Sequence, residues 1–270
     1  MGLTLCIVIL TPAFGGDRPP INDGNYHGDP PYLLEAGWKP LLNSKNLDGW
    51  EYRTPEKAGW AATRGVFWVG PDNPQQLMAS PEAGDRIVNT AGKPASDIFT
   101  TEKFGDVELY LEFLMPANSN SGVYLQGLYE IQLWDSFGRD LNDHVTNMCG
   151  AVYHYAKQVN NQYVGGLAPK VRAERPAGQW QSLYIWFQAP RFDADGKKIS
   201  KAKFLRVLFN GVLIHENVER EGPTRACMDI PEAATNPLML QGDHGLVAFR
   251  NIYIRPLRPL SKIYIKGDMK

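Results

Sequence analysis

Apolar residues along this chain recur mainly with a period of two, which is the spacing of β-strands. Because a strand sends successive side chains to opposite faces, alternating segments predict strands with one buried face. Residues 107–113 are the clearest case, with apolar side chains on one face and Glu, Tyr and Glu on the other. Two alternating runs flank Asn210-Gly211, a pair that favours the type I′ turn of a hairpin.

Residues 37–257 show no sustained 3.6-residue apolar period, so helices contribute little to the predicted fold. Residues 180–187 and 151–155 also read as strands, the first covered on both faces. In the last strand, 246–256, the apolar phase slips at Arg250–Asn251, which predicts a β-bulge there. The pattern predicts an all-β fold: a two-sheet antiparallel sandwich of jelly-roll type.

Residues 121–135 predict a hairpin with two different faces, joined by a tight turn at Gly127. One face is aliphatic and belongs to a core. The other face is expected to collect two amides, a carboxylate and two aromatic rings: Tyr124, Gln126, Glu130, Gln132 and Trp134. A lone Glu on a strand is usually only a solvated residue, but this mixture suits a sugar, which offers hydroxyl groups at its rim and C–H groups on its ring faces.

Composition narrows the class of protein without identifying it. The 270 residues are 43% hydrophobic and 21% charged, which is ordinary for a globular chain of one large all-β domain. The net charge of −1 gives no reason to expect nucleic acid or an anionic membrane as a partner. The seven Trp residues are compatible with carbohydrate contact and equally with packing in a sandwich core.

The N-terminal segment 1–16 has an apolar stretch followed by small residues, as in a secretory signal, although it lacks a basic start. It is too short to span a bilayer; the alternative is a disordered or docked terminus. Residues 17–36 read as an extended linker or an arm on the domain, 37–257 as a single jelly-roll domain, and 258–270 as a tail. We therefore expect a secreted or periplasmic protein that does not insert into the membrane after signal removal.

Three cysteines leave two alternatives open. Cys6 would be removed with the signal segment, and Cys149 and Cys227 are distant in sequence and form no CxxC pattern. They are either two free thiols, which we favour, or one disulfide in an oxidising compartment.

Several segments, in order, resemble the 3-keto-disaccharide hydrolase domain family. They are GWKPLLNSKNLDGW (37–50), FGDVELYLEFLMPANSNSGVYLQG (104–127), YEIQLWD (129–135), GAVYHY (150–155), PAGQWQSLYIWF (176–187), LFNGVLI (208–214) and GDHGLVAFRNIYIRPL (242–257). The resemblance implies a concanavalin A-like, glucanase-type jelly roll, bacterial extracytoplasmic carbohydrate metabolism, and action on glycosides already oxidised at C3. Two departures concern the substrate: Gln126 stands where the family usually has Arg, and the loop 156–175 runs differently.

The predicted strand does not carry the carboxylate pair of a retaining glycosidase, which needs two carboxylates about 5–5.5 Å apart. Glu130 is followed two residues later by Gln132, and Asp135 has the wrong parity for the same face. A 3-keto sugar needs other chemistry, because its ketone acidifies the C2 hydrogen. A base removes that proton, the enolate expels the C1 oxygen, and water adds later. Such a site needs a base, an oxyanion stabiliser and a proton donor.

We predict Glu130 and His244 as the proton-transfer residues, with Tyr124 and Arg250 near the oxyanion or a hydroxyl. Substrate contacts are predicted for Tyr124, Gln126, Gln132, Trp134, Tyr153 and Arg250. His244 in its GDHG turn could instead stabilise the loop, and Arg250 could instead pair with a carboxylate across the sheet.

No cofactor is certain. A divalent metal is possible, with ligands drawn from Asp135, Asp143, His144 and His154, although their spacing fits no strong metal motif. The expected partner is a carbohydrate. Two alternative functions remain: a non-catalytic, lectin-like carbohydrate-binding module and, with less support, a standard endo-glucanase.

Overall fold

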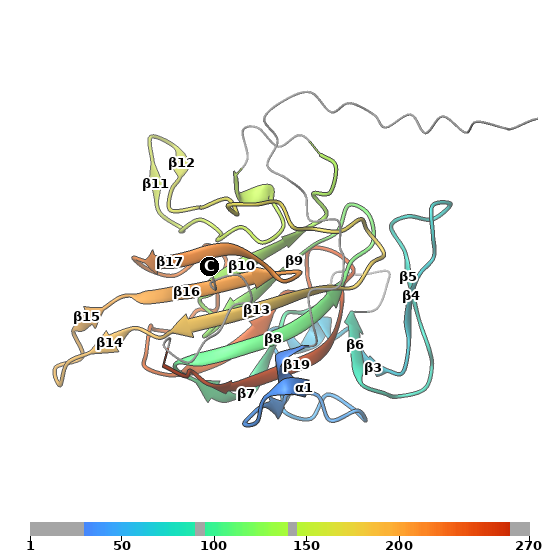
Figure 1. The fold of residues 1–270 in the computed structure, drawn as a ribbon, viewed down its shortest axis with the longest axis horizontal. Coiled ribbons are helices and arrows are strands. Elements are labelled where there is room, and N and C mark those ends of the chain that lie inside the picture. The colour runs from blue at the N-terminus through green and yellow to red at the C-terminus, as the bar shows by residue number, and fades with distance from the viewer. Residues whose placement is uncertain (1–29, 90–94, 140–144, 260–270) are drawn as a thin grey trace, which may run out of the picture.

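Two antiparallel β-sheets form the fold, and a shared hydrophobic core lies between them (Figure 1). The computed structural model describes residues 30–89, 95–139 and 145–259. Both sheets contribute to the core, with Leu111 from the larger sheet and Ile131 from the smaller sheet each fully buried. The all-β jelly-roll sandwich expected from the sequence is therefore confirmed.

The larger sheet has eight strands in the order β17-β16-β13-β8-β19-β6-β3, with β1 paired to β19. Its strands are β1 (Lys39–Pro40), β3 (Trp60–Thr63), β6 (Arg86–Asn89), β8 (Val107–Leu114), β13 (Gln181–Gln188), β16 (Ala202–Phe209), β17 (Val212–Arg220) and β19 (Ala248–Pro256). The smaller sheet has five strands in the order β10-β9-β18-β7-β2. They are β2 (Trp50–Tyr52), β7 (Ile98–Phe104), β9 (Asn120–Leu125), β10 (Tyr129–Trp134) and β18 (Asn236–Leu240).

Short elements decorate the two sheets. Three two-stranded ribbons are β4 (Val66–Trp68) with β5 (Leu77–Ala79), β11 (Gln158–Val159) with β12 (Gln162–Tyr163), and β14 (Arg191–Phe192) with β15 (Lys198–Ser200). In the described part of the chain the helices are the α-helix α1 (Pro31–Leu34) and the 3-10 turns η1 (Pro55–Lys57) and η2 (Val145–Asn147). None of these helices is long and apolar enough to cross a membrane.

Local sequence signals correctly located the main strands of the larger sheet. The 107–113 pattern becomes β8, which pairs with β13 on one side and β19 on the other. The Asn210-Gly211 turn joins β16 to β17, and both residues have positive φ, 49° and 81°, as a type I′ turn requires. The register of β19 shifts between Arg250 and Tyr253, with Asn251 at φ 49°, so the expected bulge is present.

The expected strand at 151–155 is only partly formed. Val152 makes isolated bridges to Ile131 and Leu167, whereas Tyr155 bridges Thr224. The segment leaves β10 after Tyr153, since the Tyr155 N–H donates to the carbonyl of Val164 rather than to β10. This bend prevents a continuous strand.

The segment before the domain packs on the larger sheet where the structure describes it. The Tyr32 ring stacks on Tyr253 at 3.9 Å, and Glu35 forms an ion pair with Arg255 at 2.5 Å. The expected signal segment, the first residues of the expected linker and the end of the tail lie outside the described residues.

The two cysteines in the described region are free thiols. Cys149 is buried and Cys227 is partly buried. Burial raises the pKa of both thiols, so neither has the character of a reactive thiolate.

Candidate functional site

The outer face of the β9–β10 hairpin carries the predicted polar cluster. Val123 and Ile131 point into the core, so the alternation sends Tyr124, Glu130 and Gln132 to the opposite face. Glu130 pairs with Tyr124 in the ladder, and Gln132 pairs with Gly122. The ladder therefore brings a carboxylate, a phenol and an amide together around a glycine.

The Glu130 carboxylate lies over Gly122. A Cβ at residue 122 would meet the Glu130 Cδ at 3.0 Å and the Tyr124 Cε2 at 2.9 Å, and would lie closer still to Glu130 Oε1. With its nitrogen turned toward the carboxylate, the Gln132 amide donates to Glu130 Oε1 and to the Ser121 carbonyl, both at 3.1 Å. The buried Glu130 Oε2 has no hydrogen-bond partner among the described residues. One carboxylate oxygen is thus held by Gln132, and the other accepts no hydrogen bond from the described residues.

The charge state of Glu130 is set by its burial. Glu130 is 1% exposed, and burial raises the pKa of its carboxyl well above the usual range. The Tyr124 hydroxyl and the Arg220 charge work in the opposite direction, whereas Asp97 and Asp243 raise the pKa further. A carboxyl with a raised pKa is a stronger base once ionised, which is the property a general base at neutral pH needs.

The turn after β18 brings His244 to the same region. The Gly242 N–H donates to Asp97 Oδ1 at 2.9 Å, which anchors the turn to the start of β7. His244 is half-exposed and forms a hydrogen bond with Asp243. That bond raises the pKa of His244, and the charge of Asp97 adds to the effect although partial burial opposes it. His244 therefore keeps a proton at higher pH than a free histidine.

Tyr153 and Arg225 border Glu130 on the other side. The Tyr153 N–H donates to the Glu130 carbonyl at 3.2 Å. Burial and the Glu130 charge raise the pKa of Tyr153, although a hydrogen bond with Arg225 lowers it in part. His154 stacks on Tyr153 at 4.0 Å, and burial and the charge of Arg225 lower the pKa of His154 to about 4. The Tyr153 phenol and the Arg225 cation therefore lie beside the Glu130 carboxylate, and the neutral His154 imidazole stacks on the Tyr153 ring.

Arg220 supports this border from inside the protein. Its guanidinium donates to the carbonyls of Gly165 at 2.6 Å and Tyr153 at 2.8 Å, and it lies 4.0 Å from the centre of the Tyr155 ring. Arg220 is 1% exposed. A buried cation that holds carbonyl groups fixes the course of the loop carrying Tyr153.

Most of the predicted site residues meet here. Glu130, Tyr124, Gln132 and Tyr153 form one cluster, and Trp134 follows the same alternation at the end of β10. His244 shares its electrostatic surroundings with the cluster through Asp243, whose charge also acts on Glu130.

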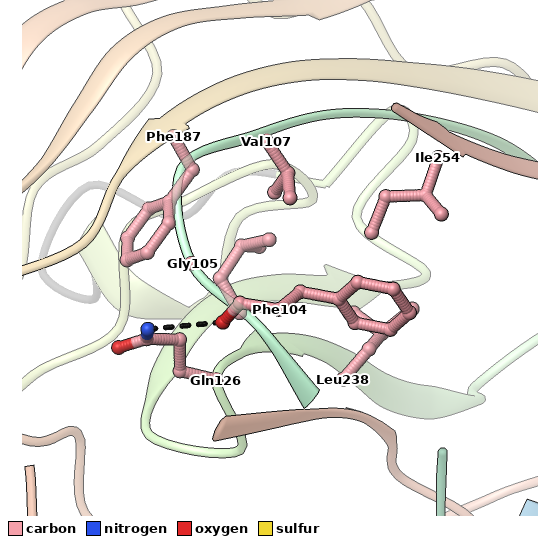
Figure 2. Close-up of a pocket in the computed structure, with 8 residues that line it drawn as sticks. Phe104, Gly105, Val107, Gln126, Phe187, Leu238 and Ile254 are labelled. Carbon is pink, nitrogen blue, oxygen red and sulfur yellow. Dashed lines mark hydrogen bonds between the residues drawn. The ribbon is translucent and has the colours of Figure 1, made fainter. Parts of the chain in front are cut away.

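Gln126 does not lie on this face, so its prediction as a member of the polar face is wrong. It occupies the turn between β9 and β10 with φ 55°, and its side chain leaves the strand alternation. Its amide donates to the carbonyls of Phe104 at 3.1 Å and Ala234 at 3.2 Å. Figure 2 shows the amide directed at Phe104 beside a small pocket that is otherwise lined mainly by apolar side chains.

Arg250 also lies elsewhere, on the outer face of the larger sheet. Its Nε donates to Glu112 Oε2 at 2.6 Å, and its guanidinium lies 4.1 Å from the centre of the Trp180 ring. The alternative of a carboxylate partner across the sheet is the one observed, because β19 pairs with β8. Arg225 is the arginine found next to Tyr153 instead.

The metal ligands considered from the sequence do not form a site where they are described. Asp135 accepts a hydrogen bond from the Asn118 N–H at 2.8 Å and pairs with Arg139. Asp143 and His144 lie outside the described residues. Within the described ranges, no group of three His, Cys, Asp or Glu side chains is arranged to hold a metal ion.

Sequence reasoning missed four charged residues of the site. Asp243 stands beside His244 in the motif already singled out, so the motif could have indicated it. Asp97, Arg53 and Arg225 lie in segments without periodic signal. Arg53 donates to Asp97 Oδ2 at 3.2 Å and so holds the carboxylate that anchors the His244 turn. These contacts join segments that are far apart in the chain.

Comparison with known proteins agrees with this architecture. A model of the 3-keto-alpha-glucoside-1,2-lyase-like domain family matches residues 37–255. A solved protein of Parabacteroides distasonis, provisionally named a glycosyl hydrolase, is 26% identical with a TM-score of 0.57, over 82% of this chain and 84% of that chain. Two further proteins of this organism with the same provisional name are similar in fold: one is 22% identical (TM-score 0.52; 82% of this chain, 100% of that one), and the other is 18% identical (TM-score 0.50; 82% and 94%). No curated protein matches the chain.

Proposed function

The chain belongs to the 3-keto-alpha-glucoside-1,2-lyase-like family and carries a carbohydrate-active domain of glycosyl hydrolase type, and from this we propose that it cleaves glycosides already oxidised at C3. The single observation that carries the proposal is the buried Glu130 carboxyl, which lies over Gly122 with one oxygen held and one oxygen unpartnered. Its raised pKa fits a base that removes a weakly acidic C–H proton.

The proposed reaction begins with proton transfer from C2 to Glu130. The electron pair of the C2–H bond forms a double bond between C1 and C2, and the bond from C1 to the leaving oxygen breaks. His244 gives a proton to that oxygen, and its own hydrogen bond to Asp243 keeps the imidazole protonated for this step. Water then adds across the double bond, with its hydroxyl at C1 and a proton at C2, so the atoms balance without an oxidant.

The negative charge that develops on the C3 oxygen needs a donor. Tyr153 carries a hydroxyl beside Glu130, and Arg225 hydrogen-bonds that hydroxyl. In this proposal the Tyr153–Arg225 pair takes the oxyanion role that the sequence assigned to Arg250. Preorganised donors aimed at developing charge stabilise such a transition state.

Hydrolysis by a pair of carboxylates has less support. Along β10 the position two residues beyond Glu130 is Gln132, whose amide donates to the same carboxylate. Asp135, the next acidic residue, is held by Arg139 and the Asn118 N–H. A retaining glycosidase of the glucanase type needs a second carboxylate about 5–5.5 Å from the first, and β10 itself does not supply one.

The decisive experiment compares a 3-keto-glucoside with its unoxidised parent, each incubated with the protein in deuterated water and followed by NMR. We expect cleavage of the keto form alone, with deuterium entering C2 of the released sugar. Glu130→Gln, which keeps the size of the side chain and the contact with Gln132, should lose cleavage while it still binds glycoside.

Two other outcomes would redirect the assignment. Cleavage of the parent at the same rate, without deuterium at C2, would contradict the elimination and favour ordinary glycoside hydrolysis. Binding of both compounds without cleavage of either would favour a carbohydrate-binding module. A secreted or periplasmic location, expected from residues 1–16, belongs to the same proposal and is tested by mapping the N-terminus of the mature protein.

A further inference from the structure

A second side chain beside Glu130 has an unpartnered oxygen. Gln241 directly follows β18, and its N–H donates to the Gly122 carbonyl at 3.0 Å, while the Ser121 hydroxyl donates to the Gln241 carbonyl at 2.7 Å. Leu238 and Leu240 point into the core. The alternation therefore sends the Gln241 side chain to the outer face, where Glu130 lies.

The strands that carry the two unpartnered oxygens lie on either side of Gly122. Gln241 is hydrogen-bonded to Gly122 from one side, and Gln132 of the β10 strand pairs with Gly122 from the other. Gln241 is 6% exposed and Glu130 is 1% exposed. Neither Gln241 Oε1 nor Glu130 Oε2 has a hydrogen-bond partner within the described part of the chain.

Two buried acceptors without donors on one face of the smaller sheet can be satisfied by a ligand that carries donors. A buried oxygen that makes no hydrogen bond costs free energy, and native proteins seldom leave such an atom unsatisfied. Since the amide oxygen of Gln241 can only accept, the group that meets it must carry an N–H or O–H. A sugar ring provides this group as a hydroxyl.

We propose that Gln241 is a specificity-determining residue that accepts a hydrogen bond from the C2 hydroxyl of the sugar ring, while Glu130 Oε2 faces the hydrogen on the same carbon. This inference rests on the proposed function of the same site. The hydroxyl and the hydrogen share one carbon, which matches two acceptors carried by the strands on either side of Gly122.

The consequence is discrimination against sugars that lack the C2 hydroxyl. A 2-deoxy-3-keto-glycoside keeps an acidic hydrogen at C2, so the elimination itself remains feasible. Binding such a compound would leave Gln241 Oε1 buried and unpaired. Sites built to hydrogen-bond a hydroxyl reject analogues without it far more strongly than apolar pockets reject small changes in size.

The test measures kcat/KM for a 3-keto-glucoside and its 2-deoxy analogue with the wild-type protein and with Gln241→Leu, which has a similar size and no acceptor. The wild type should prefer the 2-hydroxy compound by about 10-fold or more. Gln241→Leu should lose most of that preference while it still cleaves the 2-deoxy compound. Met239→Leu is the matched control, because Met239 lies on the same face of β18, is fully buried, and pairs with Tyr124; it should keep the wild-type preference.

The possible outcomes distinguish a failure of the role proposed for Gln241 from a failure of the proposed function. If the wild type cleaves both compounds and Gln241→Leu keeps the wild-type preference, the role of Gln241 is overturned and the proposed function stands. If the wild type cleaves neither compound, the proposed function fails. In that case the dissociation constants of methyl glucoside and its 2-deoxy analogue are compared for the wild type and for Gln241→Leu. The inference is overturned if the wild type shows no preference for methyl glucoside or if Gln241→Leu keeps the wild-type preference. Should Gln241→Leu fail to fold, Gln241→Asn, which draws the amide back by one methylene, should show the same loss of preference.

Discussion

Replacing Gly122 by alanine should displace the Glu130 carboxylate and lower turnover far more than it lowers stability. Gly122 has no side chain, and the carboxylate lies over its Cα. Its backbone does not need the left-handed conformation that glycine alone adopts easily. An alanine at this position would therefore act through its methyl group and not through backbone strain.

The size of the effect follows from the crowding. The new Cβ would lie 3.0 Å from Glu130 Cδ and 2.9 Å from Tyr124 Cε2, against 3.4–4 Å for an ordinary contact. Tyr124 is 1% exposed and has little room to move, so we expect the carboxylate to shift by about 1 Å, a misplacement that costs about 100-fold in rate. That loss equals about 2.7 kcal/mol of transition-state stabilisation, and overpacking should cost about 1–3 kcal/mol in stability.

The assay is kcat/KM on a 3-keto-glucoside, together with the free energy of unfolding from urea denaturation. Gly222→Ala is the control, because a Cβ at residue 222 meets no atom within 4 Å and the residue has no left-handed φ. The reasoning would be refuted if Gly122→Ala, folded and stable, turned over substrate as fast as Gly222→Ala. In that case the carboxylate over Gly122 would not be the group that reacts.

Three further predictions concern charge. The pH profile of kcat/KM should be bell-shaped, rising as Glu130 ionises above its usual pKa range and falling as His244 loses its proton; Asp243→Asn removes the bond that raises the pKa of His244 and should move the alkaline limb to lower pH. Because the pKa of Glu130 is raised in the folded protein, the stability it contributes is present below about pH 4.5 and is lost as pH rises through the folded pKa. The melting temperature of Glu130→Gln should therefore increase relative to that of the wild type between pH 4.5 and pH 8. An equal difference in melting temperature at both pH values would contradict this. Arg220→Met should lower the free energy of unfolding by about 2–4 kcal/mol, since it removes the hydrogen bonds that a buried cation donates to two backbone carbonyls. Lys203→Met, in a partly exposed ion pair with Glu219, should cost at most about 1 kcal/mol.

The alternation of apolar and polar residues along the chain determined the fold class and the site residues that lie on the β9–β10 hairpin. The period of two in β8 and in the β9–β10 hairpin separates core residues from outward residues, since this depends only on strand geometry. The same logic located Tyr124, Glu130 and Gln132 on one face. The Asn210-Gly211 turn and the slip at Arg250–Asn251 were also readable, because turn chemistry and phase are local properties.

Strand order, in contrast, was decided only by the tertiary structure. β18 pairs with β7 on one side and β9 on the other, so Asp97, Gln241 and the His244 turn come to the region of Glu130 although more than 30 residues separate each of them from it in the chain. β19 lies in the larger sheet, which takes Arg250 to Glu112 and away from the site. No local pattern encodes which strands become neighbours, because that choice minimises the free energy of the whole core.

The turn at Gln126 shows that local alternation also fails to predict the direction of a single side chain. Its identity fits the alternation of β9, but the positive φ that closes the hairpin turns its amide toward Phe104. The sequence by itself thus determined which strand carries the Glu130 carboxyl and on which face, since side-chain alternation is a property of each strand. Only the packing of distant segments decided which charges, amides and loops surround that carboxyl, because those contacts join residues with no sequence relationship to one another.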